Sequence, residues 1–255
     1  MDDPGLEKLI NVLLDSPQMQ ALWTVRDRGM PVFAHTVDVA LLALERTSAL
    51  HQQTSEVSAR VITVGSLLHD LTKATAKQTP LRSHSRIMSI CPELAADKAI
   101  EVLKAALDRT GQRFSQNELE NIVHVVISHH GPWGRVQPAT PEAKLVHQCD
   151  LYSALYHRIA PIDANDILPH LEQGRNWRAI SALLGVGTTV LKQRIEDACV
   201  AEAVDDWPAL LHIWKRRGYV LAGCSERRRQ LQRAKLLLHS AQRASECIMK
   251  AIARV

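Results

Sequence analysis

The sequence predicts an all-α protein, on the evidence of its hydrophobic spacing and its composition. Apolar residues recur at helical spacing along nearly the whole chain, as at Leu6, Leu9 and Leu13. The sequence has no convincing run of alternating strand pattern, and its two phenylalanines and three tyrosines add little β-favouring aromatic content. Because 46% of the 255 residues are hydrophobic, the chain can bury a full core without disulfides or a structural metal.

The first expected helices are read from the periodic apolar positions. One covers residues 6–14, and a second contains His35 within VFAHTVDVALLALE. A third carries the apolar positions of residues 57–68 and is expected to start at Ser55. A fourth covers residues 94–107.

Capping signals define the next two helices. Ser115 and Glu118 fit a capping box, and Gly131 with Pro132 is expected to end that helix near the preceding histidines. Thr140 is the expected cap of the following helix, with proline in its first turn. We expect a domain over residues 1–160, with its core at about 30–160.

The remaining residues, 161–255, are predicted to form a helical extension. Residues 159–170 are rich in proline and aspartate and are expected to be a linker. Residues 176–196 have the spacing of a helix-turn-helix, which is also the spacing of an ordinary helical hairpin. Residues 226–255 are predicted to form one long, basic, amphipathic helix whose apolar stripe could pair with a second copy of the chain.

The positive charge is concentrated at the end of the chain. The whole sequence has a net charge of +4, and residues 207–255 contain 11 basic and 2 acidic side chains. Such a tail favours a polyanionic partner such as nucleic acid, although a solvated basic helix has the same composition.

Cellular location is predicted from the cysteines and from the hydropathy. The five cysteines are widely spread and include no CxxC pair, which favours a reducing cytoplasm. The amino terminus lacks the pattern of a signal peptide, and no apolar run reaches the roughly 20 residues of a membrane span. We therefore expect a cytoplasmic protein without a membrane partner.

An ordered series of histidines and aspartates carries the expected chemistry. Its members are His35, His69, Asp70, His84, His129, His130 and Asp150, with Lys73 three residues after Asp70. Imidazole and carboxylate groups suit Mn, Fe, Ni, Co or Zn, and several helices can together supply the ligands. An open metal site activates water, and two metals can also hold a phosphate group. A lysine one turn beyond the ligands could neutralise phosphate charge.

Four segments in this order resemble the HD superfamily of metal-dependent phosphohydrolases. They are GSLLHDLTK (65–73), SHSRIMSI (83–90), ISHHGPWG (127–134) and TPEAKLVHQCDLYSAL (140–155). They are most similar to the bacterial YhaM-type 3′-to-5′ exoribonuclease branch. The resemblance implies an HD-domain helical bundle, a phosphoester substrate and one or two divalent metal ions, among them Mn, Fe, Ni, Co, Zn or Mg.

The resemblance also implies a role for each matching residue. It makes His35, His69, Asp70 and Asp150 the ligands of the core metal, with Asp70 bridging to a second ion. It makes His84, His129 and His130 the additional ligands of two-metal members. It makes Lys73, beside Asp70, a catalytic contact to phosphate. Family members commonly have glycine at the position of Thr72.

Residues near the paired histidines are candidates for substrate binding. Arg135 could meet a substrate phosphate, and Trp133 could stack on a base. The alternative is a loop anchored by one buried tryptophan. His147, one turn before Asp150, is interpreted either as a residue that contacts a ligand or as a surface residue, and His124 is interpreted as structural.

These residues lead to an enzyme of the phosphodiesterase or nuclease type. We expect water activated by the metal to attack a phosphoester of single-stranded nucleic acid or of a nucleotide. One alternative is an HD-type relaxase domain of conjugative transfer, which holds DNA with residues 176–196 and the basic tail. The other is a nucleic-acid-binding regulator whose HD domain senses a nucleotide without turnover.

Overall fold

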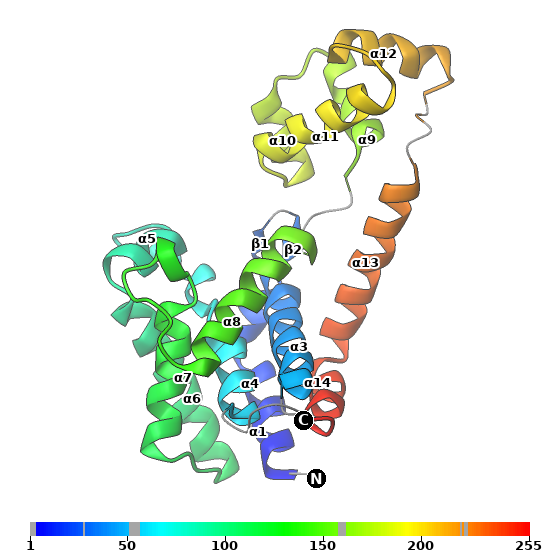
Figure 1. Ribbon diagram of the computed structural model, residues 1–255. Coiled ribbons are helices and arrows are strands. Elements are labelled where there is room, and N and C mark those ends of the chain that lie inside the picture. Colours follow the sequence, from blue (N-terminus) through cyan, green and yellow to red (C-terminus); the bar gives the residue numbers. More distant parts are fainter. Residues whose placement is uncertain (1–3, 28, 51–56, 158–161, 220, 222–223) are drawn as a thin grey trace. The chain divides into compact units, whose positions relative to one another are not determined.

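The computed structural model describes residues 4–27, 29–50, 57–157, 162–219, 221 and 224–255. Nearly all regular structure in these residues is helical (Figure 1), which confirms the all-α prediction. Two strands of two residues each, β1 (Arg26–Asp27) and β2 (Met30–Pro31), form a small sheet that the sequence analysis missed because such short strands carry no alternating pattern. Within the described residues, no helix combines the length and apolarity needed to cross a bilayer.

The chain divides into two compact units. The first comprises Met1–Val25, Pro31–His157 and Leu237–Val255, and the second comprises Arg26–Met30 and Arg158–Leu236. Residues 161–255 were predicted to form a single helical extension. The structure instead groups the last 19 of these residues with the first unit, because the final helix packs against helices near the amino terminus.

The first unit contains the helices that precede residue 158. They are α1 (Pro4–Leu14), α2 (Pro17–Ala21), α3 (Val32–Leu50), α4 (Ala59–Leu68), α5 (His84–Ile90), α6 (Glu93–Thr110), α7 (Gln116–Ser128) and α8 (Pro141–Tyr152). Short 3₁₀ turns follow α4 and α7, namely η1 (Leu71–Lys73), η2 (Ala76–Gln78) and η3 (Gly131–Trp133). A π-helical turn, η4 (Ser153–His157), extends α8.

Helix α4 is the centre of this unit. All its residues from Val61 to Leu68 are buried, because α3, α7 and α8 pack around it (Figure 1). Gly65 permits the close approach of α7, since a Cβ atom at this position would lie 2.7 Å from Cγ1 of Val125. The ends of α4 and α7, which carry the paired site residues, are therefore held next to each other.

The predicted caps of α7 and α8 are confirmed. Ser115 and Glu118 form both hydrogen bonds of a capping box. The Thr140 side chain accepts a hydrogen bond from the backbone NH of Ala143, with Pro141 in the first turn. The expected helix start at Ser55 lies outside the described residues, and α4 begins after Ser58, whose hydroxyl caps it.

The prediction of one continuous helix over residues 226–255 was wrong. The structure has two helices, α13 (Cys224–Gln242) and α14 (Ala244–Ile252), with a break at Arg243. The Arg243 guanidinium pairs with Glu246 in the first turn of α14. The break lets α14 bury Ala244 and Ile248 where it packs against α1 and α3. Ile248, a member of the predicted apolar stripe, is therefore covered by this chain.

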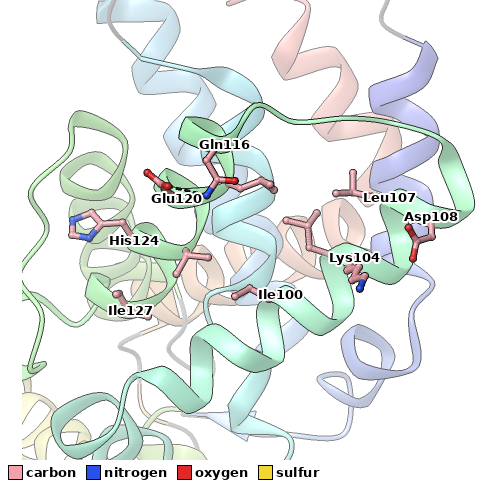
Figure 2. Close-up of a pocket in the computed structure, with 11 residues that line it drawn as sticks. Ile100, Lys104, Leu107, Asp108, Gln116, Glu120, His124 and Ile127 are labelled. Carbon is pink, nitrogen blue, oxygen red and sulfur yellow. Dashed lines mark hydrogen bonds between the residues drawn. The ribbon is translucent and has the colours of Figure 1, made fainter.

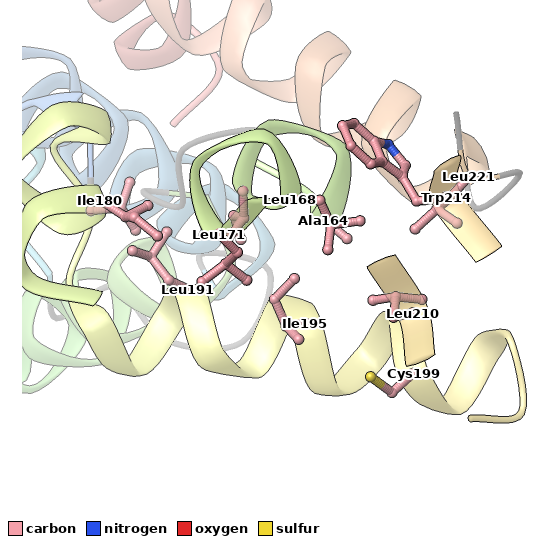
Figure 3. Close-up of a cluster of buried hydrophobic side chains, with 12 residues drawn as sticks. Ala164, Leu168, Leu171, Ile180, Leu191, Ile195, Cys199, Leu210, Trp214 and Leu221 are labelled. Atoms are coloured by element: carbon pink, nitrogen blue, oxygen red, sulfur yellow. The ribbon is translucent and has the colours of Figure 1, made fainter. Parts of the chain in front are cut away.

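The second unit has its own hydrophobic core (Figure 3). It contains α9 (Ala164–Glu172), α10 (Trp177–Leu184), α11 (Thr188–Ala201) and α12 (Trp207–Arg216). Each of these helices contributes to the core, through residues such as Leu168, Ile180, Leu191 and Trp214. A three-residue turn with Gly185 at φ 65° joins α10 to α11, so the predicted helical hairpin at 176–196 is present.

The expected linker at 159–170 is replaced in large part by α9. The aspartates of this segment cap the start of α9. The Asp163 side chain accepts a hydrogen bond from the backbone NH of Asn165, and the Asp166 side chain accepts one from the backbone NH of Asp163. Ile167 and Leu168 then face the core and are fully buried. The acidic composition that suggested a solvated linker is thus a capping pattern.

Candidate metal centre

The histidines and aspartates of the predicted series come together from five helices of the first unit. His35 lies on α3, His84 begins α5, and Asp150 lies on α8. The two pairs stand just past helix ends, because α4 ends at Leu68 and α7 ends at Ser128. A residue beyond the last regular turn can point in a direction that a helical neighbour cannot, so both members of each pair can face the same space.

Asp70 and Asp150 are the centres of this cluster. The Asp70 carboxylate lies 3.2 Å from His84 Nε2, 3.4 Å from His69 Nε2 and 3.7 Å from His35 Nε2. Asp150 Oδ1 lies 2.9 Å from His35 Nε2 and 3.9 Å from His69 Nε2. The rings of the three histidines and the Asp70 side chain are almost fully buried.

Backbone carbonyls orient two of the rings. His69 Nδ1 lies 2.6 Å from the Ser66 carbonyl oxygen, and His129 Nδ1 lies 2.7 Å from that of Val126. A carbonyl only accepts, so each Nδ1 carries a proton and donates it. In the neutral rings the lone pair is then on Nε2, and both Nε2 atoms face the cluster. This is the orientation that metal-ligating histidines generally have.

The cluster has the properties of a cation site. His69 Nε2 is buried and has no hydrogen-bond partner among the described residues, although a carboxylate oxygen of Asp70 lies 3.4 Å away. Nitrogen and oxygen ligand atoms of His35, His69 and Asp70 lie within 4.8 Å of one another, as do those of His69, His129 and Asp150. A mixed imidazole and carboxylate donor set fits divalent transition metals. The residues therefore fit the metal that the sequence resemblance implies.

The pKa directions agree with this chemistry. Burial opposes ionisation of Asp70, but the Lys73 ammonium and His69 outweigh it and hold the carboxyl pKa well below its usual value. Burial, reinforced by the neighbouring His69 and His130 rings, puts the pKa of His129 well below that of free imidazole. Burial and the His84 ring lower the pKa of His130 to about 4. The carboxylate is thus charged and these two rings are neutral, the states in which each can bind a metal.

His69 has the opposite shift. Burial disfavours its protonated form, but the Asp70 and Asp150 carboxylates outweigh this effect and raise the pKa of the ring. The space between His69 and these carboxylates therefore attracts positive charge. A proton on His69 and a metal ion compete for it.

A second group of ligand atoms lies beside the first. Ring nitrogens of His84, His129 and His130 are within 4.8 Å of one another. His84 Nε2 is 3.2 Å from both His129 Nε2 and Asp70 Oδ1. Because Asp70 touches both groups, one carboxylate could serve two ions.

The stretch of sequence that carries this cluster matches a known protein family. Residues 32–155 match the HD domain. All seven candidate ligands lie in this stretch, which we call the HD segment. The match implies a metal-dependent phosphohydrolase, the class that the sequence resemblance also implied. The searches of curated proteins and of solved structures returned no match.

Lys73 lies at the edge of the cluster in the HD segment. Its ammonium is 2.7 Å from Asp70 Oδ2, and 16% of its side chain is exposed, against 1% for Asp70. The 3₁₀ turn η1 directs the lysine back over the aspartate three residues earlier. Lys73 thus links the buried carboxylate to solvent, from which a substrate would approach.

The two predicted substrate-binding residues lie in the turn after the paired histidines. Trp133 is 65% exposed, so the alternative of a loop anchored by a buried tryptophan is wrong. The Arg135 guanidinium pairs with Glu93 and donates to the Ile90 carbonyl oxygen. These contacts tie Arg135 to α5 and α6 and provide no support for the predicted phosphate contact.

Sequence reasoning missed several residues that orient the ligands. Thr72 Oγ1 lies 2.7 Å from His84 Nδ1, and Ser153 Oγ lies 2.9 Å from His35 Nδ1. His147 Nδ1 donates to the His129 carbonyl oxygen at 2.6 Å. Its ring also fills the space beside Gly131, which has φ 53° and where a Cβ atom would lie 2.4 Å from that ring. The signals in the sequence were the threonine two residues after Asp70 and the position of His147 one turn before Asp150.

An apolar groove of about 640 Å³ lies between α6 and α7 (Figure 2). Apolar side chains such as Leu103, Leu119 and Val123 form most of its wall. His124 is on its rim, where its Nε2 accepts a hydrogen bond from the backbone NH of Ala139. The sequence interpretation of His124 as a structural residue agrees with this position.

Proposed function

We propose that this chain is a metal-dependent phosphodiesterase that cleaves single-stranded nucleic acid or a nucleotide. The observation that carries the proposal is the buried convergence of His35, His69, Asp70 and Asp150, with Nε2 of His69 left without a hydrogen-bond partner among the described residues. The match of residues 32–155 to the HD domain supports the same class of reaction.

The ligands would divide between two ion positions. His35, His69, Asp70 and Asp150 would hold the core ion, and His84, His129 and His130 would hold a second one with Asp70 between them. A divalent cation in such a site supplies charge for phosphate oxygens and lowers the pKa of bound water toward neutrality. The chain itself provides Lys73, whose partly exposed ammonium can turn from Asp70 toward a substrate phosphate.

Two features favour a substrate that carries a base. The indole of Trp133 is exposed two residues after the start of η3, which directly follows His130, so a base can stack on it next to the site. The excess of basic residues in 207–255 favours a polyanion. Together they support a nucleic acid or nucleotide over other phosphoesters.

Replacing Trp133 with alanine is expected to raise the KM for single-stranded oligonucleotides about 5- to 150-fold, because stacking on one base contributes about 1–3 kcal/mol. The rate of hydrolysis of bis-p-nitrophenyl phosphate, which has no nucleobase, should not change. Labelled single-stranded RNA, single-stranded DNA, a cyclic dinucleotide and a deoxynucleoside triphosphate are assayed with Mn²⁺.

The conservative variant Trp133→Phe is the matched control and should retain most of the oligonucleotide affinity. Equal KM values for wild type and Trp133→Ala on every nucleotide substrate would show that Trp133 does not stack on a base of the substrate. Wild-type protein that hydrolyses none of these substrates, including the generic diester, would overturn the proposed function.

The hairpin of α10 and α11 favours a second candidate, a DNA-holding regulator or relaxase domain. Its three-residue glycine-containing turn is typical of a helix-turn-helix. Exposed residues of α11 include acidic Glu196 and Asp197 beside Lys192, so this helix is not a basic surface, and we rank the candidate second. It predicts nucleic-acid binding that survives loss of the metal ligands and falls steeply with salt.

A further inference from the structure

His35 differs from the other oriented histidines in its surroundings. His69 and His129 stand at helix ends, where the carbonyl three residues earlier is free to accept from the ring. His35 lies inside α3, where the backbone carbonyls are engaged in the helix. Its ring therefore needs an acceptor from another element, and Ser153 Oγ lies 2.9 Å from Nδ1.

The direction of the hydrogen bond between His35 and Ser153 follows from the second contact of Ser153, which is with Asp38. Ser153 Oγ is 2.5 Å from Asp38 Oδ2, and a carboxylate only accepts hydrogen bonds. The single hydroxyl proton of Ser153 is thus donated to Asp38. Ser153 can then only accept from the ring, so His35 Nδ1 must carry the proton.

The placement of these residues is built from two helices. His35 and Asp38 are one turn apart on α3, and Asp150 and Ser153 are one turn apart along α8 and the π-helical turn η4. The second pair contacts both ring nitrogens, with Asp150 Oδ1 2.9 Å from Nε2. His157, at the end of η4, lies 2.9 Å from Asp38 Oδ2 and holds this carboxylate from the other side.

We propose that Ser153 and Asp38 are positioning residues that fix the neutral His35 ring in the form with a bare Nε2. In this form the Nε2 lone pair and Asp150 Oδ1 lie 2.9 Å apart, and a cation can bind beside both. The inference rests on the proposed function in one respect, because that cation is the proposed core metal. Ser153 itself is fully buried and does not touch a substrate.

The test compares Ser153→Ala and Asp38→Asn with matched variants on α3. Ser48→Ala removes a hydroxyl that donates to the carbonyl oxygens of Leu44 and Arg254 and does not contact His35, and Glu45→Gln removes an exposed carboxylate. Long-range ¹H–¹⁵N NMR of the metal-free full chain reports which His35 nitrogen is protonated, at about pH 8.5, roughly two units above the ordinary imidazole pKa. Calorimetry without substrate measures Mn²⁺ affinity.

The wild type and both control variants are expected to show His35 protonated on Nδ1. Ser153→Ala and Asp38→Asn should shift the proton toward Nε2, where Asp150 accepts it, and should weaken Mn²⁺ binding about 10- to 100-fold. If Ser153→Ala leaves the His35 tautomer unchanged and only lowers the melting temperature, Ser153 stabilises the fold without positioning the ring, and the inference is overturned.

The two proposals fail in different ways. If Ser153→Ala changes the tautomer while wild-type protein binds no Mn²⁺, the hydrogen-bond direction is supported and the proposed function is overturned. If wild type binds Mn²⁺ and Ser153→Ala binds it equally well with the same tautomer, the positioning role is overturned and the metal site remains.

Discussion

Replacing Asp70 with asparagine is expected to lower metal affinity and phosphodiester hydrolysis by 100-fold or more. Asp70 is the residue that contacts both groups of candidate ligands, through His35 and His69 on one side and His84 on the other. The amide keeps the shape of the side chain and removes its charge. Loss of several kcal/mol of electrostatic stabilisation corresponds to at least 100-fold, at about 1.4 kcal/mol per tenfold.

Mn²⁺ calorimetry and hydrolysis of a generic diester measure this effect. The control is Asp108→Asn, which removes an exposed carboxylate on α6 away from the cluster and should leave both quantities unchanged. Circular dichroism checks that the variants are folded. An Asp70→Asn protein that is folded and binds Mn²⁺ as tightly as wild type would refute the assignment of Asp70.

The second large effect is expected at Gly65, where α4 packs closely against Val125 of α7. An alanine Cβ would lie 2.7 Å from Val125 Cγ1, so the Val125 side chain or the two helices must shift. Overpacking of a core costs about 1–3 kcal/mol, whereas Gly→Ala inside a helix gains about 0.5–1 kcal/mol. The steric cost is the larger, and Gly65→Ala should reduce the free energy of unfolding.

The double variant Gly65→Ala/Val125→Ala tests the cause. Truncating Val125 removes the atom that the new methyl group meets, so the double variant should be more stable than the sum of the two single effects predicts. Chemical denaturation of all four proteins measures this coupling. Strict additivity would show that the two helices do not limit each other at Gly65.

Gly65→Ala should also weaken Mn²⁺ binding, because it lies four residues before His69 and Val125 lies four residues before His129. A shift of α4 against α7 separates the two histidines. Metal affinity that recovers in the double variant would connect this packing contact to the site.

The sequence predicted the helices well where the signal is local. Capping residues such as Ser115 and Thr140 bond to the backbone three residues later, so the signal for a helix start lies within one short segment of sequence. The structure confirms both helix starts. The candidate ligands are recognisable because their order and spacing along four segments form a pattern. These residues come together because the helices that carry them pack as a helical bundle, which the resemblance implied.

The sequence did not predict contacts between distant residues that lack a pattern. Ser153 and Asp38 are 115 residues apart, and neither belongs to the four segments' recognised ligand positions. Arg135 forms an ion pair with Glu93, 42 residues earlier in the chain. This pair depends on how α5, α6 and the η3 turn pack together, which no local sequence pattern indicates. The break at Arg243 likewise depends on where α14 can bury its apolar face.

The central claim is that a divalent cation binds among His35, His69, Asp70 and Asp150. Crystals grown with Mn²⁺ test it most directly, through an anomalous difference map collected at the manganese absorption edge. We predict a strong peak next to Nε2 of His35 and His69 and the two carboxylates. A map in which this space has no anomalous density, while Mn²⁺ is present in the crystal, would contradict the account.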